Sequence, residues 1–166
     1  MASKTILQWN CRGLRSNYSD LDVLFNTFSP AVVCLQETLQ SDQNLSNFRH
    51  FTQIFKNATK IDGRPNGGVA ILIKNSIPHS TIQLNSNLQA TAARITLHKL
   101  ITICSIYLPP TTVFTQNELT DLLVQLPSPV LLMGDFNSHN PLWGGSTLDT
   151  RGKIVQDLST TTTCVS

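Results

Sequence analysis

The residues with the clearest chemical potential follow an apolar run at residues 130–133. This run, Val-Leu-Leu-Met, leads directly into Gly134, Asp135, Phe136 and Asn137. It predicts a buried strand that brings a carboxylate and a carboxamide to the edge of a sheet, with both side chains pointing the same way. Such a pair can bind a hard cation, or it can hold and activate a water molecule. The Gly-Asp-x-Asn spacing is also common in turns, and for this segment alone the turn remains the alternative.

Three further apolar runs also end at a residue capable of site chemistry. Residues 5–9, 31–36 and 101–106 are followed by Asn10, Glu37 and Tyr107, respectively. In open α/β sheets ligand sites gather at the carboxyl ends of strands, so these side chains are candidates to meet Asp135 and Asn137. Each also has a structural explanation, as a turn former, a solvated strand end or an aromatic residue at the edge of the core. The recurrence of this design at four strand ends favours a shared site.

The chemistry of this set is oxygen-based. Two carboxylates and two amides suit one Mg²⁺ ion, with Mn²⁺ as the alternative, together with an attacking water, and a tyrosine hydroxyl can donate to a phosphate oxygen. No Ser–His or Cys–His nucleophile pair is evident, which disfavours covalent catalysis. The four cysteines and four histidines show no zinc-ligand spacing, and Cys34 and Cys104 are expected to be small buried hydrophobes. The pattern predicts metal-assisted phosphoester hydrolysis.

A layered scaffold is needed to bring these strand ends together, and the periodicity of the apolar residues predicts one. Two amphipathic helices are indicated by apolar stripes, at Leu21, Leu24, Phe25 and Phe28 and, after a capping box of Thr115 and Glu118, at Leu119, Leu122, Leu123 and Leu126. A third helix is expected over residues 151–158, with a loop or short helix at 42–47 and a loop at 61–68. Strands are expected at residues 5–9, 31–36, 48–55, 69–74, 90–97, 100–107 and 130–133. This order predicts an α/β or α+β layered fold with a hairpin of strands 90–97 and 100–107.

The composition limits the classes of protein to consider. Of 166 residues, 40% are hydrophobic and 13% are charged, which suits one globular domain and argues against a disordered chain. The net charge of +2 permits nucleic acid as a partner without indicating it. No apolar run is long enough to span a bilayer, and residues 1–10 lack the layout of a signal peptide. We therefore expect an intracellular protein with no membrane partner.

Five motifs occur in order along the chain and together identify a family resemblance. They are Gln8-Trp9-Asn10-Cys11-Arg12-Gly13-Leu14, Leu35-Gln36-Glu37-Thr38, Gly67-Gly68-Val69-Ala70-Ile71, Ser105-Ile106-Tyr107-Leu108-Pro109-Pro110 and Gly134-Asp135-Phe136-Asn137. The chain resembles the endonuclease/exonuclease/phosphatase superfamily, and within it the apurinic-type endonuclease domain of LINE (non-LTR) retrotransposons, particularly the jockey-like insect elements. Leu142-Trp143-Gly144 and Arg151-Gly152 favour this branch over the lipid or inositol phosphatases. The resemblance covers residues 4–158 as one domain and leaves residues 159–166 as a tail with no assigned element.

The resemblance implies a four-layered α/β sandwich of the DNase I-like type, with two mixed β-sheets flanked by helices. It implies Mg²⁺-dependent nicking of DNA, without a small-molecule cofactor. Glu37 would hold the metal with Asn10 near it, and Tyr107 would contact the scissile phosphate. Asp135 would orient or deprotonate the water, and Asn137 would position it. In intact elements the nick primes reverse transcription, so a reverse transcriptase domain is the expected partner and the nucleus the expected location.

The closing segment of the family is not matched. The family's domain continues through a Ser/Thr-Ile-Asp segment to a Ser-Asp-His motif, and nothing after Gly145 resembles either of them. His139 lies in the loop just after Asn137 and is not a substitute. A positioned group of this kind is typically worth about 10²–10⁴-fold in rate. We therefore expect a domain that lacks its C-terminal strands and is weak or inactive; the alternatives are a non-catalytic DNA-binding remnant and a phosphatase of a small phosphoester.

Overall fold

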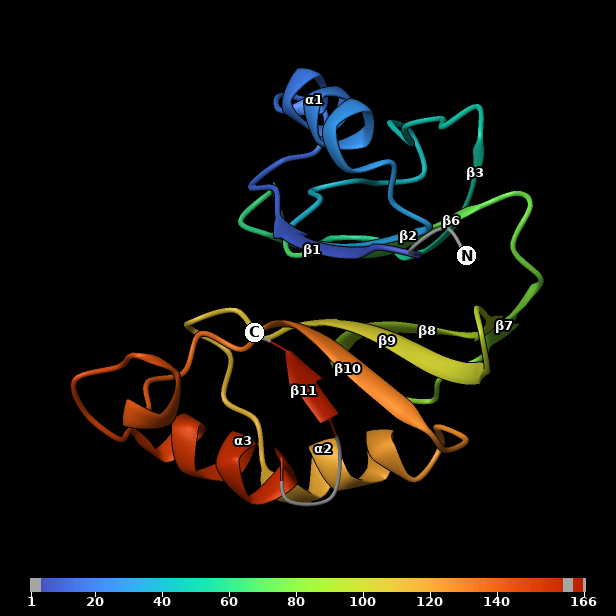
Figure 1. Ribbon diagram of the computed structural model, residues 1–166. Coiled ribbons are helices and arrows are strands. Elements are labelled where there is room, and N and C mark those ends of the chain that lie inside the picture. Colours follow the sequence, from blue (N-terminus) through green and yellow to red (C-terminus); the bar gives the residue numbers. More distant parts are fainter. Residues whose placement is uncertain (1–3, 160–162, 166) are drawn as a thin grey trace.

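Four layers make up the structure, in the order helix, sheet, sheet and helices (Figure 1). The computed structural model describes residues 4–159 and 163–165. The first sheet has the strand order β1 (Ile6–Asn10), β2 (Val32–Gln36), β6 (Val69–Lys74) and β3 (Phe51–Lys56). The second has the order β11 (Thr163–Val165), β10 (Val130–Asp135), β9 (Leu100–Tyr107), β8 (Gln89–Thr96) and β7 (His79–Ile82). Each sheet combines parallel and antiparallel pairs, which confirms the expected α/β fold with two mixed sheets.

Helices cover the outer face of each sheet. The helix α1 (Tyr18–Phe28) lies on the first sheet, and α2 (Gln116–Leu123) and α3 (Thr150–Ser159) lie on the second (Figure 1). Two small elements complete the described structure: a hairpin of β4 (Thr59–Ile61) and β5 (Arg64–Asn66), and a 3₁₀ turn, η1 (Pro141–Trp143). Residues 6–74 supply the strands of the first sheet, and residues 79–165 supply those of the second.

Apolar clusters fill the three interfaces between the four layers. In β2, Val33 and Leu35 pack in the cluster that contains α1, whereas Val32 and Cys34 pack in the cluster between the sheets. Strands β6 and β9 divide their side chains in the same alternating way. Strands that are covered on both faces are apolar at successive positions rather than at every second one, which explains the continuous apolar runs of the sequence.

The expected helices are confirmed at nearly the expected bounds. The stripe residue Leu21 of α1 is fully buried, as are the stripe residues Leu119 and Leu122 of α2. The capping box at the start of α2 is present, with Glu118 N–H donating to Thr115 Oγ1 over 3.2 Å and Thr115 N–H donating to Glu118 Oε2 over 2.8 Å. The third helix extends one residue beyond the predicted span at each end.

Three segments differ from expectation. The predicted loop at residues 61–68 is wrong in part, because β4 and β5 pair across a turn at Asp62 and Gly63, and Asp-Gly is a favoured sequence for a two-residue hairpin turn. Strand β7 was not expected because its sequence, His-Ser-Thr-Ile, is mostly polar; it lies at the edge of the second sheet. Of residues 159–166, Thr163–Val165 form β11, which pairs in parallel with β10, while residues 160–162 and 166 lie outside the described part of the chain.

Candidate active site

The carboxyl ends of two parallel strand pairs bring the predicted site residues to one edge of the molecule. In the β1–β2 pair Asn10 lies opposite Gln36, so Glu37 follows immediately at the end of β2. In the β9–β10 pair Asp135 lies opposite Tyr107. Because the first pair belongs to one sheet and the second pair to the other, the four side chains approach one another across the interface between the sheets.

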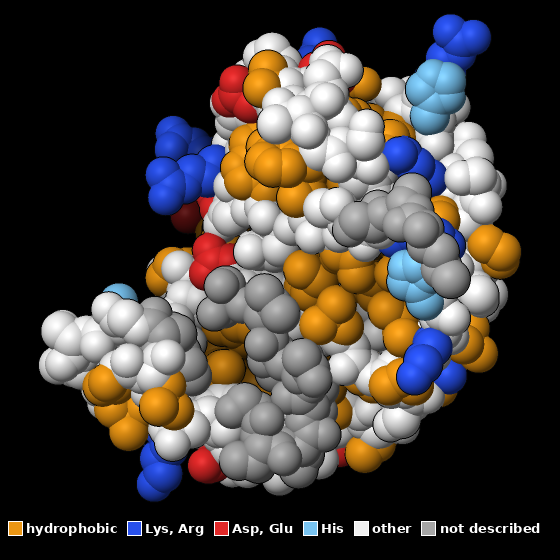
Figure 2. Space-filling view, viewed as in Figure 1, with side chains coloured by type: hydrophobic (Ala, Val, Ile, Leu, Met, Phe, Trp, Pro, Cys, Tyr) orange, Lys and Arg blue, Asp and Glu red, His pale blue; other side chains and the backbone are white. Residues whose placement is uncertain are grey.

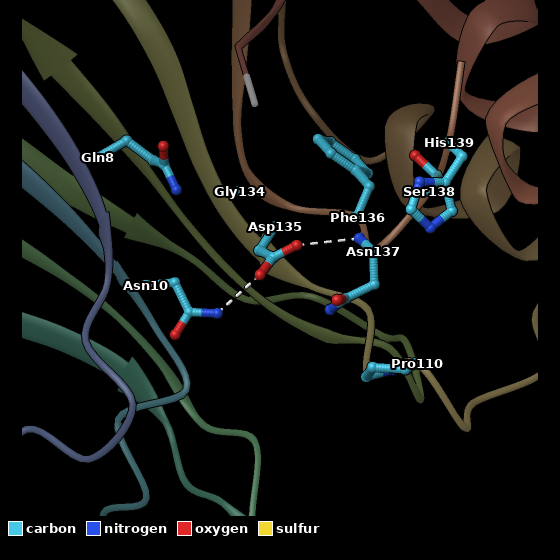
Figure 3. A pocket seen from close by; sticks show the side chains of 9 residues that line it. All are labelled: Gln8, Asn10, Pro110, Gly134, Asp135, Phe136, Asn137, Ser138 and His139. Carbon is cyan, nitrogen blue, oxygen red and sulfur yellow. Dashed lines mark hydrogen bonds between the residues drawn. The ribbon is translucent and has the colours of Figure 1, made fainter. Parts of the chain in front are cut away.

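Asp135 is the centre of the hydrogen bonds at this edge (Figure 3). Its Oδ2 accepts from Asn10 Nδ2 over 2.7 Å, and its Oδ1 accepts from the backbone N–H of Asn137 over 2.9 Å. The side chain of Asn137 donates to the carbonyl oxygen of Leu108 over 3.1 Å. Asp135 therefore forms the turn that the Gly-Asp-x-Asn spacing suggested, and it also contacts an amide of the other sheet. Each carboxylate oxygen keeps a further lone pair for a water molecule.

Tyr107 lies close to both carboxylates, and its side chain is almost fully buried. Burial raises the pKa of Tyr107 to about 12, and the negative charges of Glu37 and Asp135 act in the same direction, as does a hydrogen bond to Glu37. The positive charge of Arg12 has the opposite effect on this pKa. The phenol is therefore a neutral hydrogen-bond donor throughout the ordinary pH range.

The backbone around the site adopts conformations that L-residues rarely occupy. Arg12, Glu37 and Asn137 follow β1, β2 and β10, and their φ angles are 46°, 54° and 45°. Such left-handed conformations cost free energy and persist where the surrounding structure holds them, as it often does at functional sites. Gly134 is required for another reason, since a Cβ atom at this position would lie 1.9 Å from the carbonyl oxygen of Ile106.

A cavity of about 440 Å³ opens beside Asp135, and its lining includes Gln8, Asn10, Asn137 and His139 (Figure 3). The space-filling view shows a hollow on its left side, with Lys and Arg as well as Asp or Glu side chains along the upper edge (Figure 2). The cavity brings together three of the five predicted site residues, whereas Glu37 and Tyr107 are not among its lining residues. His139 is exposed at the cavity, and its backbone N–H and C=O are bonded to Asp149.

Arg151 joins the two loops that follow the catalytic candidates of the second sheet. One nitrogen of its guanidinium, Nη2, donates to the carbonyl oxygens of Leu108 over 2.7 Å and Phe136 over 2.9 Å. The other, Nη1, donates to the carbonyl oxygens of Pro109 over 3.1 Å and Thr112 over 2.8 Å.

An aromatic ring also lies close to this guanidinium. The guanidinium lies 4.8 Å from the centre of the Phe114 ring. Burial lowers the pKa of Arg151, and the negative charges of Asp149 and Asp135 and the nearby Tyr107 oppose that shift. In the sequence, Arg151 was recognised only as part of the Arg151-Gly152 motif. Its hydrogen bonds could not be predicted, because nothing in the local sequence shows that an arginine near the start of a helix will contact carbonyl oxygens about 40 residues away.

A buried polar network links the sheets beneath the site, and sequence reasoning also missed it. Gln36 Nε2 donates to Ser105 Oγ over 2.9 Å, and Ser105 Oγ donates to the carbonyl oxygen of Leu35 over 3.2 Å. Gln8 Nε2 donates to Gln36 Oε1 over 2.7 Å. Gln36 and Ser105 are fully buried in otherwise apolar strands, so these bonds fix how the two sheets align and hence where Asn10 meets Asp135.

The donor set for a metal ion is small. Within the described residues, no group of three or more His, Cys, Asp or Glu side chains is placed to hold a metal. Two carboxylates and the Asn10 amide oxygen remain, which suits Mg²⁺, an ion that is commonly bound by one or two carboxylates and keeps several waters. In the part of the chain that the structure describes, none of the helices has the length and apolar character needed to cross a membrane.

Comparisons with known proteins agree on one family. A family model described as the Endonuclease/Exonuclease/phosphatase family matches residues 7–165. Among curated proteins, the chain is 26% identical over 156 residues to the probable RNA-directed DNA polymerase from transposon X-element of Drosophila melanogaster. It is 25% identical over 154 residues to the RNA-directed DNA polymerase from mobile element jockey of the same species. These matches cover 92% and 90% of this chain but only 17% and 16% of the two relatives.

Solved structures show the same fold at low sequence identity. The endonuclease domain of TRAS1, a telomere-specific non-LTR retrotransposon, superposes with a TM-score of 0.73 at 18% identity, covering 95% of this chain and 70% of that one. An AP endonuclease from Archaeoglobus fulgidus superposes with a TM-score of 0.61 at 15% identity, covering 94% of this chain and 71% of that one.

Proposed function

The chain belongs to the endonuclease/exonuclease/phosphatase family, and from that premise we propose that it nicks DNA by metal-assisted hydrolysis of a phosphodiester. The observation that carries the proposal is the Asn10–Asp135 hydrogen bond of 2.7 Å, made beside a cavity and close to Tyr107. A carboxylate fixed by two donors, with lone pairs to spare, is suited to act on a water molecule rather than to serve as a structural ion pair.

In the proposed reaction Asp135 accepts a proton from the attacking water. The water oxygen forms a bond to phosphorus while the bond from phosphorus to the 3′ oxygen breaks, which leaves a 3′-hydroxyl and a 5′-phosphate. Asn10 and the Asn137 backbone N–H hold the carboxylate in one orientation, so Asp135 does not have to reorient before it accepts the proton. The leaving 3′ oxygen takes its proton from solvent, so we expect turnover to be slow.

Tyr107 has the properties of a phosphate ligand in this proposal. Because its pKa is raised to about 12, its hydroxyl stays protonated and can donate a hydrogen bond to a phosphate oxygen. A neutral donor at a fixed position stabilises the negative charge that develops on the phosphate oxygens during attack.

Glu37 and Asn10 are the residues that would hold a divalent ion. The fit rests on the donor set: a carboxylate and an amide oxygen, next to a substrate that itself supplies phosphate oxygens. A bound Mg²⁺ would polarise the scissile phosphate, and Mn²⁺, with the same preference for oxygen, would serve in its place. Glu37 accepts the hydrogen bond of Tyr107 in this structure, and when a phosphate binds, the single hydroxyl proton of Tyr107 would be donated to a phosphate oxygen instead, which would free the Glu37 oxygen for the ion.

DNA is the proposed substrate, and a reverse transcriptase the proposed partner. Support comes from relatives named as RNA-directed DNA polymerases and from the fold shared with a retrotransposon endonuclease domain. The Lys and Arg side chains along the upper edge of the hollow in Figure 2 would contact the phosphate backbone. A nuclear location follows from this substrate as a further prediction.

A supercoiled-plasmid assay tests the proposal. With Mg²⁺ we expect these 166 residues to convert supercoiled plasmid into the nicked form slowly, at about 10²–10⁴-fold below a family member that carries the Ser-Asp-His motif. EDTA and the Asp135→Ala variant should each abolish the nicking, whereas Asn26→Ala, on the exposed face of α1, should not change it. Nicking that resists EDTA, or that survives in Asp135→Ala, would contradict the mechanism, and rapid nicking would contradict the expected weakness.

A further inference from the structure

A second cavity, of about 250 Å³, lies against Tyr107 and is separate from the one beside Asp135. Its walls come from four segments: the β4–β5 hairpin, residues 87–89 at the start of β8, the end of β9 with the loop after it, and α2. Its lining includes Ile61, Asn66, Asn87, Gln89, Tyr107 and Val113. We call it the hairpin pocket. Because Tyr107 lines it, a nucleotide strand held at the proposed active site would pass its mouth.

Three carboxamides and two exposed apolar side chains are among the residues that line the hairpin pocket. Among the described residues, the side chains of Asn66 and Asn87 have no hydrogen-bond partner, and Gln89 uses its Oε1 to accept from Gly68 N–H over 3.1 Å. Val113 is 92% exposed and Ile61 is 52% exposed, so both present apolar surface to solvent at the pocket. Amides with free donors and acceptors beside apolar surface match the two chemical features of a nucleobase, a polar edge and an apolar ring face.

The wall that carries Asn87 is held in place from two directions. Lys56 Nζ donates to the carbonyl oxygens of Ser86 over 2.8 Å and Leu88 over 2.7 Å. The Asn85 backbone N–H donates to Gln125 Oε1 over 2.7 Å, and Gln125 Nε2 donates back to the Asn85 carbonyl over 3.1 Å. A wall fixed in this way loses little freedom when a ligand binds, which favours recognition.

Charge decides which part of a nucleotide would enter. Glu118 also lines the hairpin pocket, and its carboxylate disfavours a phosphate inside it. Arg64 is exposed and pairs with Ile61 across the hairpin, so both residues point from the same face of β4–β5. Arg64 is therefore placed to contact a phosphate at the mouth while a base lies within.

We propose that the hairpin pocket binds the base of a nucleotide next to the scissile phosphate and so selects where the chain nicks. This inference rests on the proposed nuclease function for the identity of the strand. Asn66 and Asn87 would form the hydrogen bonds to the base edge, and Ile61 and Val113 would cover its ring.

An NMR titration tests binding without any need for turnover. The probes are the four dinucleotides TpA, TpC, TpG and TpT, added to the 166-residue chain. We expect the side-chain amide resonances of Asn66 and Asn87 to shift, with at least about five-fold tighter binding for one of the four. The double variant Asn66→Ala/Asn87→Ala should lose this discrimination, whereas the matched control Asn26→Ala/Gln43→Ala, which removes two exposed amides elsewhere, should keep it. Equal binding of all four dinucleotides, or no shift at these amides, overturns the proposal.

Sequencing of nick positions separates this proposal from the nuclease function. If the chain nicks DNA and the pocket selects a base, its nicks should favour one base at one flanking position by about five-fold, and the Asn66/Asn87 double variant should lose that preference while it still nicks. Base-selective NMR shifts without nicking would leave base binding in the pocket standing, and would reject the nuclease and with it the pocket's role in choosing a nick site. Nicking whose base preference is unchanged in the double variant would reject the pocket and leave the nuclease standing.

Discussion

Asn10 and Asp135 are 125 residues apart in the sequence and belong to different sheets, yet Asn10 Nδ2 donates to Asp135 Oδ2 over 2.7 Å. The bond joins the ends of β1 and β10 at the wall of the 440 Å³ cavity. It therefore reports on two things at once, the alignment of the sheets and the orientation of the carboxylate proposed to activate water.

Replacing Asn10 by alanine should affect activity more than stability. A hydrogen bond to a charged group at a partly exposed site contributes about 1–2 kcal/mol to the free energy of unfolding, which urea denaturation would measure. The nicking rate should fall by about 10²-fold because Asp135 loses its orienting donor. Wild-type nicking by Asn10→Ala would show that the carboxylate does not need this donor.

Replacing Glu37 by glutamine should lower the pKa of Tyr107. In the wild type the charge of Glu37 and its hydrogen bond help to raise that pKa to about 12, after burial. Removing the negative charge makes the phenolate less unfavourable, so Tyr107 should ionise at lower pH in Glu37→Gln. An ultraviolet titration of tyrosinate absorbance measures the change, and Tyr107→Phe, which leaves Tyr18 as the sole tyrosine, identifies its contribution.

The same raised pKa predicts a loss of stability at high pH. Between the ordinary tyrosine value of 10.0 and about 12, the unfolded chain has lost the Tyr107 proton while the folded chain retains it. Stability from this group is thus fully present below pH 10 and is lost as the pH rises toward 12. The loss of unfolding free energy over this interval should be smaller in Tyr107→Phe than in the wild type.

Replacing Arg151 even by lysine should lower the free energy of unfolding. Its two terminal nitrogens donate to the carbonyl oxygens of Leu108, Pro109, Thr112 and Phe136, and a single ammonium group cannot reach all of them. We expect Arg151→Lys to lose about 1–2 kcal/mol of unfolding free energy and Arg151→Met about 3 kcal/mol, by urea denaturation. Arg49→Met, at an exposed position, is the matched control and should change stability by less than about 0.5 kcal/mol.

Gly134→Ala should destabilise the chain strongly. The new Cβ would lie 1.9 Å from the Ile106 carbonyl oxygen and 2.7 Å from its Cγ2 atom, so β9 and β10 would have to separate. A loss of about 2–3 kcal/mol in unfolding free energy is expected, together with a lower melting temperature. Gly63→Asn is the control, because a side chain there meets nothing within 4 Å and asparagine tolerates a left-handed φ. Similar losses in both variants would show that flexibility, rather than the close approach of β9, explains the need for glycine.

Much of the fold was predictable because local pattern and tertiary burial agree. The stripe of Leu21 and the capping box of Thr115 and Glu118 predict helices that the structure contains. The runs at β2, β6, β9 and β10 predict strands because burial on both faces makes them continuously apolar. The β4–β5 hairpin and β7 were missed because their side chains are largely exposed, so no apolar pattern signals them.

For the candidate site, the sequence predicted which strand ends lie together and no further detail. The rule that ligands gather at the carboxyl ends of strands selected Asn10, Glu37, Tyr107 and Asp135. The hydrogen bonds of Arg151 and the Gln36–Ser105 bond were not predicted, because both depend on contacts with residues far away in the chain. A polar residue inside an apolar run is the one signal that could have found Gln36 and Ser105.

The division of the chain into two contiguous halves has a consequence for how the site comes into existence. Residues 6–74 contain Asn10 and Glu37, while residues 79–165 contain Tyr107 and Asp135, so neither half contains all of the candidate site residues. The segment between Lys74 and His79 is therefore a natural place to split the protein into two complementary fragments. Each fragment alone should be inert, and nicking would be regained only when the two reassociate. For a proposed nuclease, this arrangement means that the site exists only once the two halves have docked.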